Sequence, residues 1–409
     1  MKTGRIAILS ASHLCRNPRV VKEATSLGAA GHDVTVLTVS SHERFERMDQ
    51  ELMRGRPFQR KVVDHTADTL AARARGFIQR GSTWGARLLC RSLRFETAAA
   101  LGPASALLRL ARAEPADLFI CHTEIPTWAA RYLIRDGRRV AVDVEDWYSQ
   151  DLLFADRANR PLRLLERAER FALQHAAYVS TTSDSMAEAL AEAYGGPRPL
   201  TLRNTFPLQE RHRLDRPPAV GAPSFIWFSQ TIGPGRGLEL FLAAWSRMRH
   251  RSQVCLLGDE RPGYREQLLA RVPAERRGDV RFLALVTPDE LPNLLAEHDI
   301  GLALEPHWPR NRDLTISNKI FQYLNAGLAV VATDTLGQAE VMRAAPNVGL
   351  LIAGHETTQV TAQLDELVGD PARLRSTQAH ARGAAQTAFA WEHDAPRLLA
   401  AVERALGGT

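Results

Sequence analysis

Short runs of β-branched and aliphatic residues alternate with helical stretches along almost the whole chain. In the first half, apolar runs predict strands over 5–9, 33–39, 117–122, 138–144, 177–183 and 200–204. A second series predicts strands over 224–229, 253–258, 280–286, 300–306, 329–334 and 348–353. Strands that alternate with helices are typical of βαβ units, so the pattern predicts an α/β protein with parallel sheets.

The same pattern divides the chain into two halves. With 409 residues the chain is too long for one ordinary core. Residues 206–223 contain four prolines and no regular periodicity, which is typical of an interdomain linker. We therefore expect a first domain over 1–205 and a second over 224–388. Two doubly wound, Rossmann-like domains are expected to face each other across a cleft, with ligands at the carboxyl ends of their strands.

Composition excludes several classes of protein. With 45% hydrophobic and 24% charged residues the chain is typical of soluble globular proteins. It has no apolar run near the ~18 residues that span a bilayer, and its first run, IAIL, is shorter than the roughly seven residues of a signal-peptide core. The four cysteines form no CxxC pair, which argues against a disulfide framework or a zinc site. These features predict a cytoplasmic protein.

Positive charge is concentrated in one part of the first domain. The formal net charge is +6, and residues 51–100 contain ten Arg or Lys against four Asp or Glu. In 73–95, arginines alternate with apolar residues such as Phe77, Trp84 and Leu88. A basic amphipathic helix of this kind binds an anionic membrane surface or an acidic acceptor, and the other interpretation is a solvated, arginine-rich helix face. Because no nucleic-acid-binding motif accompanies the charge, we expect no nucleic-acid partner.

A glycine turn follows the first predicted strand of the second domain, in the sequence FSQTIGPGRGLELF (228–241). The turn GPGRG exposes backbone N–H groups, and the following helix adds a partial positive charge. Arg236 within such a turn indicates a site for a phosphate or diphosphate. The spacing matches neither a dinucleotide-binding GxGxxG motif nor a Walker motif. The other interpretation is a tight connection between strand and helix with an exposed arginine.

A second informative segment is DLTISNKIFQYLNAGLAVVATDTLGQAEVM (313–342). Ser317 and Asn318 are suitable N-caps for the helix that follows. Lys319 lies in the first turn of that helix, where the helix macrodipole disfavours a cation, so the sequence suggests an anion nearby. The other interpretation is a lysine that faces solvent at a cost of only a few tenths of a kcal/mol.

The order and spacing of these segments resemble the GT-B glycosyltransferases, and especially the retaining enzymes of glycosyltransferase family 4 (glycosyl transferases group 1). GHDVTVLT (31–38) resembles the second strand of their first domain. GPGRGLELFLAAW (233–245) resembles their glycine turn with a basic residue, and 319–341 resembles their donor-site block. The segment 389–406 resembles their last helix, which crosses back, so we expect 389–409 to pack against the first domain.

The resemblance implies roles for residues of the second domain. Gly235, Arg236 and Gly237 would hold the donor diphosphate, together with Ser317, Asn318 and Lys319. Gln322, Val286 and Gly258 would contact the nucleoside. The chain departs from the family pattern at three positions, because Gln230 replaces a usual second basic residue, and Gln322 and Leu314 replace the two glutamates of the donor motif. Glutamine can still bond ribose hydroxyls, and Asp313, beside Leu314, is the preferred substitute for the missing sugar contact, with Glu305 as the other choice.

In the first domain the resemblance makes His122 a catalytic candidate, since it matches a histidine that lies beside the transferred sugar in the family. A histidine after a strand also has an ordinary structural interpretation. Glu145 and Asp146 are expected on the acceptor side, where they either act on an acceptor hydroxyl or cap a helix. Arg16 and Arg19 are assigned to acceptor binding. The sequence DVED (143–146) imitates a DxD metal motif of another fold, so we expect no metal.

Together these features predict transfer of a sugar from a UDP- or GDP-sugar to a hydroxyl acceptor, with retention of configuration and without metal or cofactor. The acceptor would be a glycan, a lipid-linked intermediate or a natural product. Assembly of cell-envelope polysaccharide at the inner face of the membrane is one setting that suits the basic segment. Two other functions remain open, a GT-B sugar-nucleotide epimerase and a non-catalytic nucleotide-sugar-binding homologue.

Overall fold

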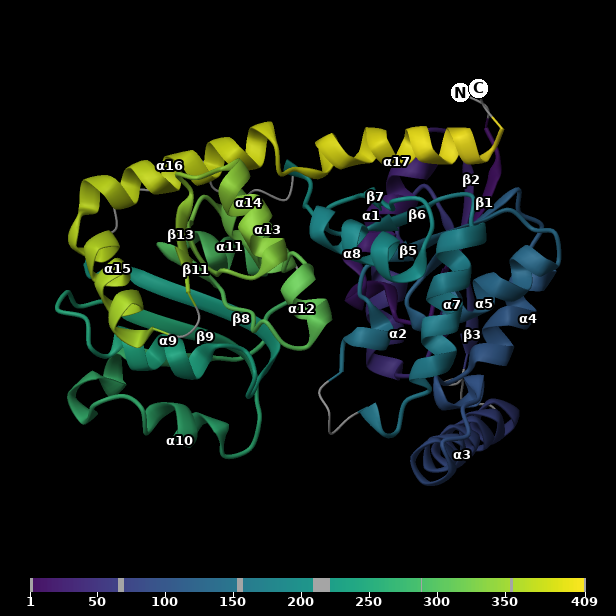
Figure 1. The fold of residues 1–409 in the computed structure, drawn as a ribbon, viewed down its shortest axis with the longest axis horizontal. Helices are drawn as coiled ribbons and strands as arrows, with labels where there is room; N and C mark the ends of the chain where they lie inside the picture. Colours follow the sequence, from purple (N-terminus) through teal and green to yellow (C-terminus); the bar gives the residue numbers. More distant parts are fainter. Residues whose placement is uncertain are drawn as a thin grey trace. The chain divides into compact units, whose positions relative to one another are not determined.

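The structure is a computed structural model that describes residues 3–64, 70–152, 157–208, 221–287, 289–353 and 356–407 (Figure 1). The chain divides into two compact units, Met1–Leu202 with Ala395–Thr409, and Arg203–Asp394. Of the predicted linker, 209–220 lies outside the described residues. Among the described residues, no helix combines the length and apolar character needed to cross a membrane.

The first unit contains a seven-stranded parallel sheet in the order β3-β2-β1-β4-β5-β6-β7. Its strands are β1 (Arg5–Ser10), β2 (Asp33–Ser40), β3 (Gln59–Asp64), β4 (Leu118–His122), β5 (Val140–Val144), β6 (Val179–Thr181) and β7 (Leu200–Thr201). The order reverses between β1 and β4, which is the switch point at which doubly wound folds bind ligands.

Helices of the first unit connect these strands (Figure 1). They are η1 (Leu14–Arg16), α1 (Pro18–Ala29), α2 (Glu43–Leu52), α3 (Leu70–Leu93), η2 (Ala98–Ala100), α4 (Ala104–Ala113), α5 (Glu124–Arg135), η3 (Tyr148–Gln150), α7 (Leu162–His175) and α8 (Asp184–Tyr194). The last helix, α17 (Trp391–Ala405), begins in the second unit, and its residues from Ala395 onward belong to the first.

The second unit contains a six-stranded parallel sheet in the order β10-β9-β8-β11-β12-β13, which repeats the order of the first sheet without a seventh strand. Its strands are β8 (Ser224–Ile232), β9 (Gln253–Glu260), β10 (Val280–Leu283), β11 (Ile300–Ala303), β12 (Ala329–Thr333) and β13 (Gly349–Ile352). Its helices are α9 (Leu238–Trp245), α10 (Tyr264–Leu269), η5 (Ala274–Asp279), α11 (Leu291–Ala296), α12 (Arg310–Leu314), α13 (Asn318–Ala326), α14 (Leu336–Ala344), α15 (Thr357–Gly369) and α16 (Pro371–Thr387).

Helices cover both faces of the second sheet (Figure 1). Successive side chains of a strand point to opposite faces, so an apolar run such as that of β8 supplies two cores. Phe225 and Trp227 belong to one buried cluster with residues of α9, α10 and α15. Ile226 belongs to another cluster with residues of α11, α13 and α16. This double burial confirms the α/β, doubly wound fold class that the sequence predicts.

Some boundaries differ from the sequence prediction. β10 and β11 end at Leu283 and Ala303, because the apolar residues that follow belong to loops. β8 continues to Ile232 through a register shift opposite β9. The edge strand β3 is absent from the predicted set, because four of its residues are polar or charged.

Candidate active site

The predicted glycine turn joins β8 to α9 and depends on two glycines. Gly235 and Gly237 have φ angles of 73° and 72°, in the left-handed region that glycine adopts without strain. A Cβ atom on Gly237 would also lie 3.0 Å from the Cβ of Leu304, so this position has little room for a side chain. The turn therefore holds Arg236 between two backbone positions that other residues adopt only with strain.

Arg236 lies beside a buried ion pair. The Lys319 ammonium donates to Glu305 Oε1 at 2.7 Å, and Arg236 Nη1 lies 3.9 Å from Glu305 Oε2. Arg312, on α12, adds a third cation, because its Nη1 donates to the carbonyl oxygen of Gly235 at 2.9 Å and its charge acts on Glu305. The turn after β8, helix α12 and the first turn of α13 thus bring three cations near the one carboxylate of Glu305, in the loop after β11.

The position of Glu305 is fixed by its backbone. Its N–H donates to Thr333 Oγ1 at 2.9 Å, and the same hydroxyl donates to the Glu305 carbonyl at 2.7 Å. Burial alone would raise the pKa of Glu305, but the charge and hydrogen bond of Lys319, with Arg236 and Arg312, lower it below its ordinary value. Glu305 is therefore an ionised carboxylate that balances part of the cationic charge.

Ser317 is the N-cap residue of α13, but its side chain makes no capping hydrogen bond, which corrects one detail of the prediction. Its hydroxyl instead lies 3.4 Å from both Lys319 Nζ and Glu305 Oε1. Asn318 is the first helical residue rather than the cap. Lys319 is only 6% exposed, which excludes the interpretation of a solvent-facing lysine.

A second polar cluster follows Glu305 in the chain. His307 Nδ1 lies 2.8 Å from Asp313 Oδ1, and its Nε2 lies 3.0 Å from Asp334 Oδ1. Asp313 Oδ1 also accepts from the backbone N–H of Leu336 at 3.3 Å. Burial lowers the pKa of His307, but both carboxylates outweigh it and raise that pKa above its usual value. Sequence reasoning missed His307 and Asp334, because they are adjacent only in the folded chain.

The three nucleoside candidates lie in different settings. The Oε1 atom of Gln322 is buried and accepts no hydrogen bond from the described residues. It can therefore accept one from a ligand hydroxyl. Gly258 has a φ of 155°, and a Cβ there would lie 2.5 Å from the Ser229 carbonyl oxygen, so close packing of β8 on β9 accounts for this glycine. Val286 lies in the loop after β10. Their nucleoside contacts stay predictions.

In the first unit, Arg19 and His122 belong to a buried charge network rather than to an open surface. Arg19 is 0% exposed and donates to both oxygens of Asp143 at 2.8 and 2.6 Å, and to the Leu202 carbonyl at 2.9 Å. His122, also 0% exposed, lies 3.1 Å from Glu23 and 3.3 Å from Asp143. Burial lowers the pKa of His122, but these carboxylates raise it overall.

This enclosure bears on two site assignments, which stay predictions. The hydrogen bonds of the Arg19 guanidinium go to Asp143 and Leu202, both in its own unit, which favours a role in positioning Asp143 over acceptor binding. His122 has no exposed surface for a substrate, so its structural interpretation fits this structure better than a catalytic one. Arg16 is exposed at η1, after β1, and remains an acceptor candidate.

Glu145 and Asp146 directly follow β5, above the buried network, and both are half-buried. Burial raises the pKa of Glu145, Arg19 lowers it, and the neighbouring charges of Asp146 and Asp143 raise it again, to about 7. A carboxyl group with this pKa is half-protonated near neutral pH, which suits a group that exchanges a proton with a hydroxyl.

Two groups of described residues bring three metal-binding side chains together, namely Glu23, His122 and Asp143, and His13, Glu46 and Asp49. An arginine already occupies each group, because Arg19 pairs with Asp143 and Arg60 pairs with Glu46 and Asp49. The guanidinium charge opposes binding of a metal cation at the same carboxylates.

Two family models match the chain. The model described as "Glycosyl transferase 4-like domain" matches residues 17–204, and the one described as "Glycosyl transferases group 1" matches residues 222–370. The chain belongs to the group 1 glycosyltransferases. Its resemblance to family 4 is consistent with both matches. None of the curated proteins compared with the chain matches it.

Solved structures show the same fold. The chain resembles HepE from Anabaena in complex with UDP at a TM-score of 0.69 and 16% identity, over 98% of this chain and 100% of that one. It resembles sucrose-phosphate synthase from Thermosynechococcus elongatus at a TM-score of 0.70 and 15% identity, over 100% of both chains. A putative UDP-N-acetylglucosamine 2-epimerase from Listeria monocytogenes matches at a TM-score of 0.58 and 14% identity, over 98% of this chain and 96% of that one. This group 1 glycosyltransferase therefore has the GT-B fold.

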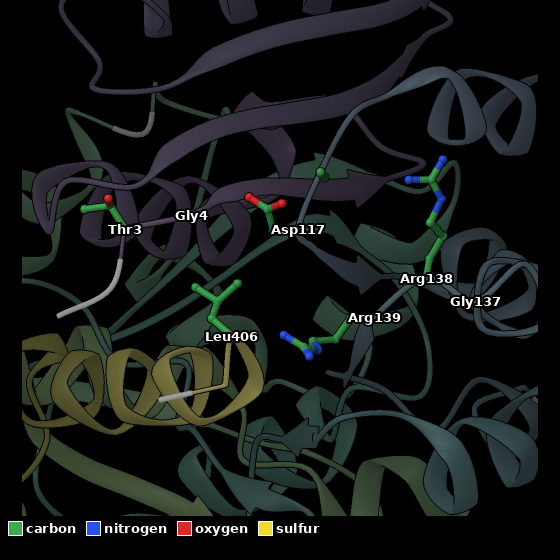
Figure 2. A pocket seen from close by; sticks show the side chains of 8 residues that line it. Thr3, Gly4, Asp117, Gly137, Arg138, Arg139 and Leu406 are labelled. Carbon is green, nitrogen blue, oxygen red and sulfur yellow. The ribbon is translucent and has the colours of Figure 1, made fainter. Parts of the chain in front are cut away.

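One pocket of this glycosyltransferase lies within the first unit. It has a volume of about 490 Å³ and is lined by residues such as Gly4, Asp117, Arg139 and Leu406 (Figure 2). Gly4, Asp117 and Arg139 directly precede β1, β4 and β5, so the pocket opens at the amino ends of these strands. The candidate residues of this unit lie at the opposite, carboxyl ends.

Proposed function

We propose that the protein transfers a sugar from a nucleotide-sugar donor to a hydroxyl acceptor. The observation that carries this proposal is the cluster of Arg236, Lys319 and Glu305 beside the glycine turn. Arg236, Lys319 and Arg312 carry three positive charges. The carboxylate of Glu305 carries one negative charge, so the net charge of the cluster is +2. This charge complements the two negative charges of the diphosphate in a nucleotide sugar, and arginine is well suited to phosphate oxygens.

The nature of the donor is supported by one relative. The HepE structure contains UDP, and HepE shares the fold of this chain along nearly its whole length. We therefore propose that uridine diphosphate or guanosine diphosphate binds beside Arg236. Gln322, on α13, offers its buried oxygen to a ribose hydroxyl.

The proposed chemistry is electrostatic. When the bond between sugar and phosphate breaks, negative charge develops on the leaving nucleoside diphosphate, and Arg236 and Lys319 stabilise that charge. Fixed cations can take the part that a metal ion plays in other transferases, so we propose metal-independent transfer. Retention of configuration is proposed from the resemblance to family 4.

The acceptor side is proposed for the first unit. Glu145, with a pKa of about 7, is the group that accepts the proton of the acceptor hydroxyl, and Asp146 adjoins it. The exposed Arg16 is proposed to bind the acceptor. His122 acts through Asp143 and Glu23, which it holds in place, rather than on the substrate.

Contact with a cytoplasmic membrane face is proposed for α3. Of the large hydrophobic side chains exposed among the described residues, seven lie between 77 and 95, including Phe77 (73% exposed), Trp84 (70%) and Leu93 (70%). Arginines at 75, 80, 87 and 91 lie on the same helix. Apolar side chains beside cations fit the interface of an anionic bilayer, which supports a lipid-linked acceptor.

The experiment incubates the purified protein with UDP- and GDP-hexoses, hydroxyl acceptors and anionic vesicles. Free nucleoside diphosphate together with a glycosylated acceptor is the expected result. An epimerised donor would instead identify an epimerase, and binding without turnover would identify a non-catalytic homologue.

A binding measurement tests the phosphate site directly. Arg236→Ala should weaken the affinity for the nucleoside diphosphate by ten- to a hundredfold, since a charge-assisted hydrogen bond contributes about 1.5–3 kcal/mol. Arg373→Ala, which removes an exposed arginine paired with Glu366 on neighbouring helices, is the control and should leave the affinity unchanged. Equal affinity of Arg236→Ala and the native protein would refute the phosphate assignment.

A further inference from the structure

The cluster of His307, Asp313 and Asp334 lies next to the residues that we propose to bind the diphosphate. His307 follows Glu305 by two residues, and Asp334 follows Thr333, the residue whose hydroxyl bonds both backbone groups of Glu305. Asp313 adjoins Arg312, which donates to the glycine turn. Each member of the cluster is thus within two residues of a group that frames the diphosphate site.

In a nucleotide sugar, the sugar is bonded directly to the terminal phosphate. Side chains that border the phosphate group are therefore the first to meet the sugar hydroxyls. The residue at the usual sugar-contacting position cannot serve, because Leu314 is apolar and only 4% exposed, within the core. A sugar at this place needs other hydrogen-bond acceptors.

We propose that the two carboxylates bridged by His307 bind the hydroxyl groups of the donor sugar. Asp313, His307 and Asp334 thereby determine which sugar the enzyme accepts. This inference rests on the proposed function, and it adds His307 and Asp334 to the sugar contact of Asp313 that the sequence predicts.

The geometry of the cluster suits this role. Each aspartate directs its Oδ1 to the imidazole, and among the described residues the structure records no hydrogen bond to either Oδ2. The side chains of Asp313, His307 and Asp334 are 21%, 41% and 39% exposed, so a ligand can reach them. A carboxylate oxygen accepts a hydroxyl hydrogen bond, and two carboxylates held by one imidazole have a fixed spacing that favours particular hydroxyl arrangements.

The competing explanation is that His307 only joins the loop after β11 to the amino end of α14. Under that explanation the cluster only supports the loop. Removing one of its side chains would then also disturb the neighbouring residues that bind the diphosphate. The two explanations therefore differ in whether the sugar or the whole nucleotide is affected.

The test measures binding of UDP, GDP and their hexose conjugates to the full chain by calorimetry. The native protein should bind at least one conjugate, and Asp334→Asn should weaken that binding about tenfold or more. Its affinity for the matching free nucleoside diphosphate should stay within about twofold. Asp313→Asn should behave in the same way, which guards against a folding defect in one variant.

The control is Glu275→Gln, which removes an exposed carboxylate on η5 and should change neither affinity. Equal weakening of conjugate and free diphosphate in the aspartate variants would establish the loop explanation and overturn ours. Unchanged affinity for both ligands would overturn it too. If the native protein binds free nucleoside diphosphate but Arg236→Ala does so equally well, the proposed function fails separately from this inference, and if no nucleotide binds, both fail.

Discussion

Glu145 shows how burial alters the ionisation of one carboxyl group at the end of a strand. Its pKa of about 7 lies well above the ordinary 4.5, chiefly because burial disfavours the charged form. Between these two values the folded protein keeps a proton that the unfolded chain has lost. Stability linked to Glu145 is therefore full below about pH 4.5 and falls as the pH rises towards 7.

Replacement of Glu145 by Gln should remove this part of the pH dependence. Urea unfolding at several pH values between 5 and 8 should show that the native free energy of unfolding falls with rising pH and that the Glu145→Gln variant falls less between pH 5 and 7. His122 also has a raised pKa, so its contribution stays full below its ordinary value of 6.5 and declines only above it, which leaves pH 5–6.5 as the range where the comparison isolates Glu145. Parallel curves for the two proteins would show that Glu145 ionises normally.

At the scale of elements, α3 is the helix whose exposed side chains differ most from an ordinary solvated face. Replacement of Phe77, Trp84 and Leu93 by Ser should reduce binding to anionic vesicles at least tenfold, because the three most exposed apolar side chains of this segment could no longer insert into the bilayer. The measurement is vesicle sedimentation at low and physiological salt. A variant with Leu285→Ser, which changes an exposed leucine of the second unit, should bind like the native protein.

Neutral vesicles provide the second comparison for α3. Since arginines accompany the apolar residues, native binding should weaken when anionic lipid is omitted or salt is raised. Native and triple-variant proteins that bind vesicles equally would show that α3 is only a solvated face.

Elements could be predicted from the sequence where burial on two faces made the chain apolar. The runs of β1 and β12 are of this kind, since almost every residue is buried, and so is the start of β8, where Phe225, Ile226 and Trp227 are buried. β3 could not be found, because an edge strand exposes half of its residues and its polar sequence QRKVVD carries no apolar run. The turn at Arg236 and the start of α13 were predictable from glycine and capping residues, whereas the contacts of Lys319 with Glu305 and of His307 with Asp334 depend on how β11 meets β12.

At the scale of the whole molecule, each unit has its own sheet and its own core. Within the second unit there are two apolar clusters, one on each face of the sheet. The residues of the proposed diphosphate-binding site all belong to this unit, namely Arg236, Glu305, Arg312 and Lys319. Binding of a nucleoside diphosphate should therefore stabilise the second unit against unfolding and leave the first unit unchanged.

We expect calorimetry to resolve two unfolding transitions, of which the nucleoside diphosphate raises only one. At a ligand concentration of about 100 Kd the stabilisation is about 2.7 kcal/mol, which for a unit of this size corresponds to roughly 5–10 °C. Arg236→Ala should lose at least about half of this shift at the same ligand concentration, because its affinity is ten- to a hundredfold lower, while the other transition stays at the same temperature in both proteins. A single transition that moves as a whole would show that the units unfold together, and a shift of the other transition would place the nucleotide in the first unit.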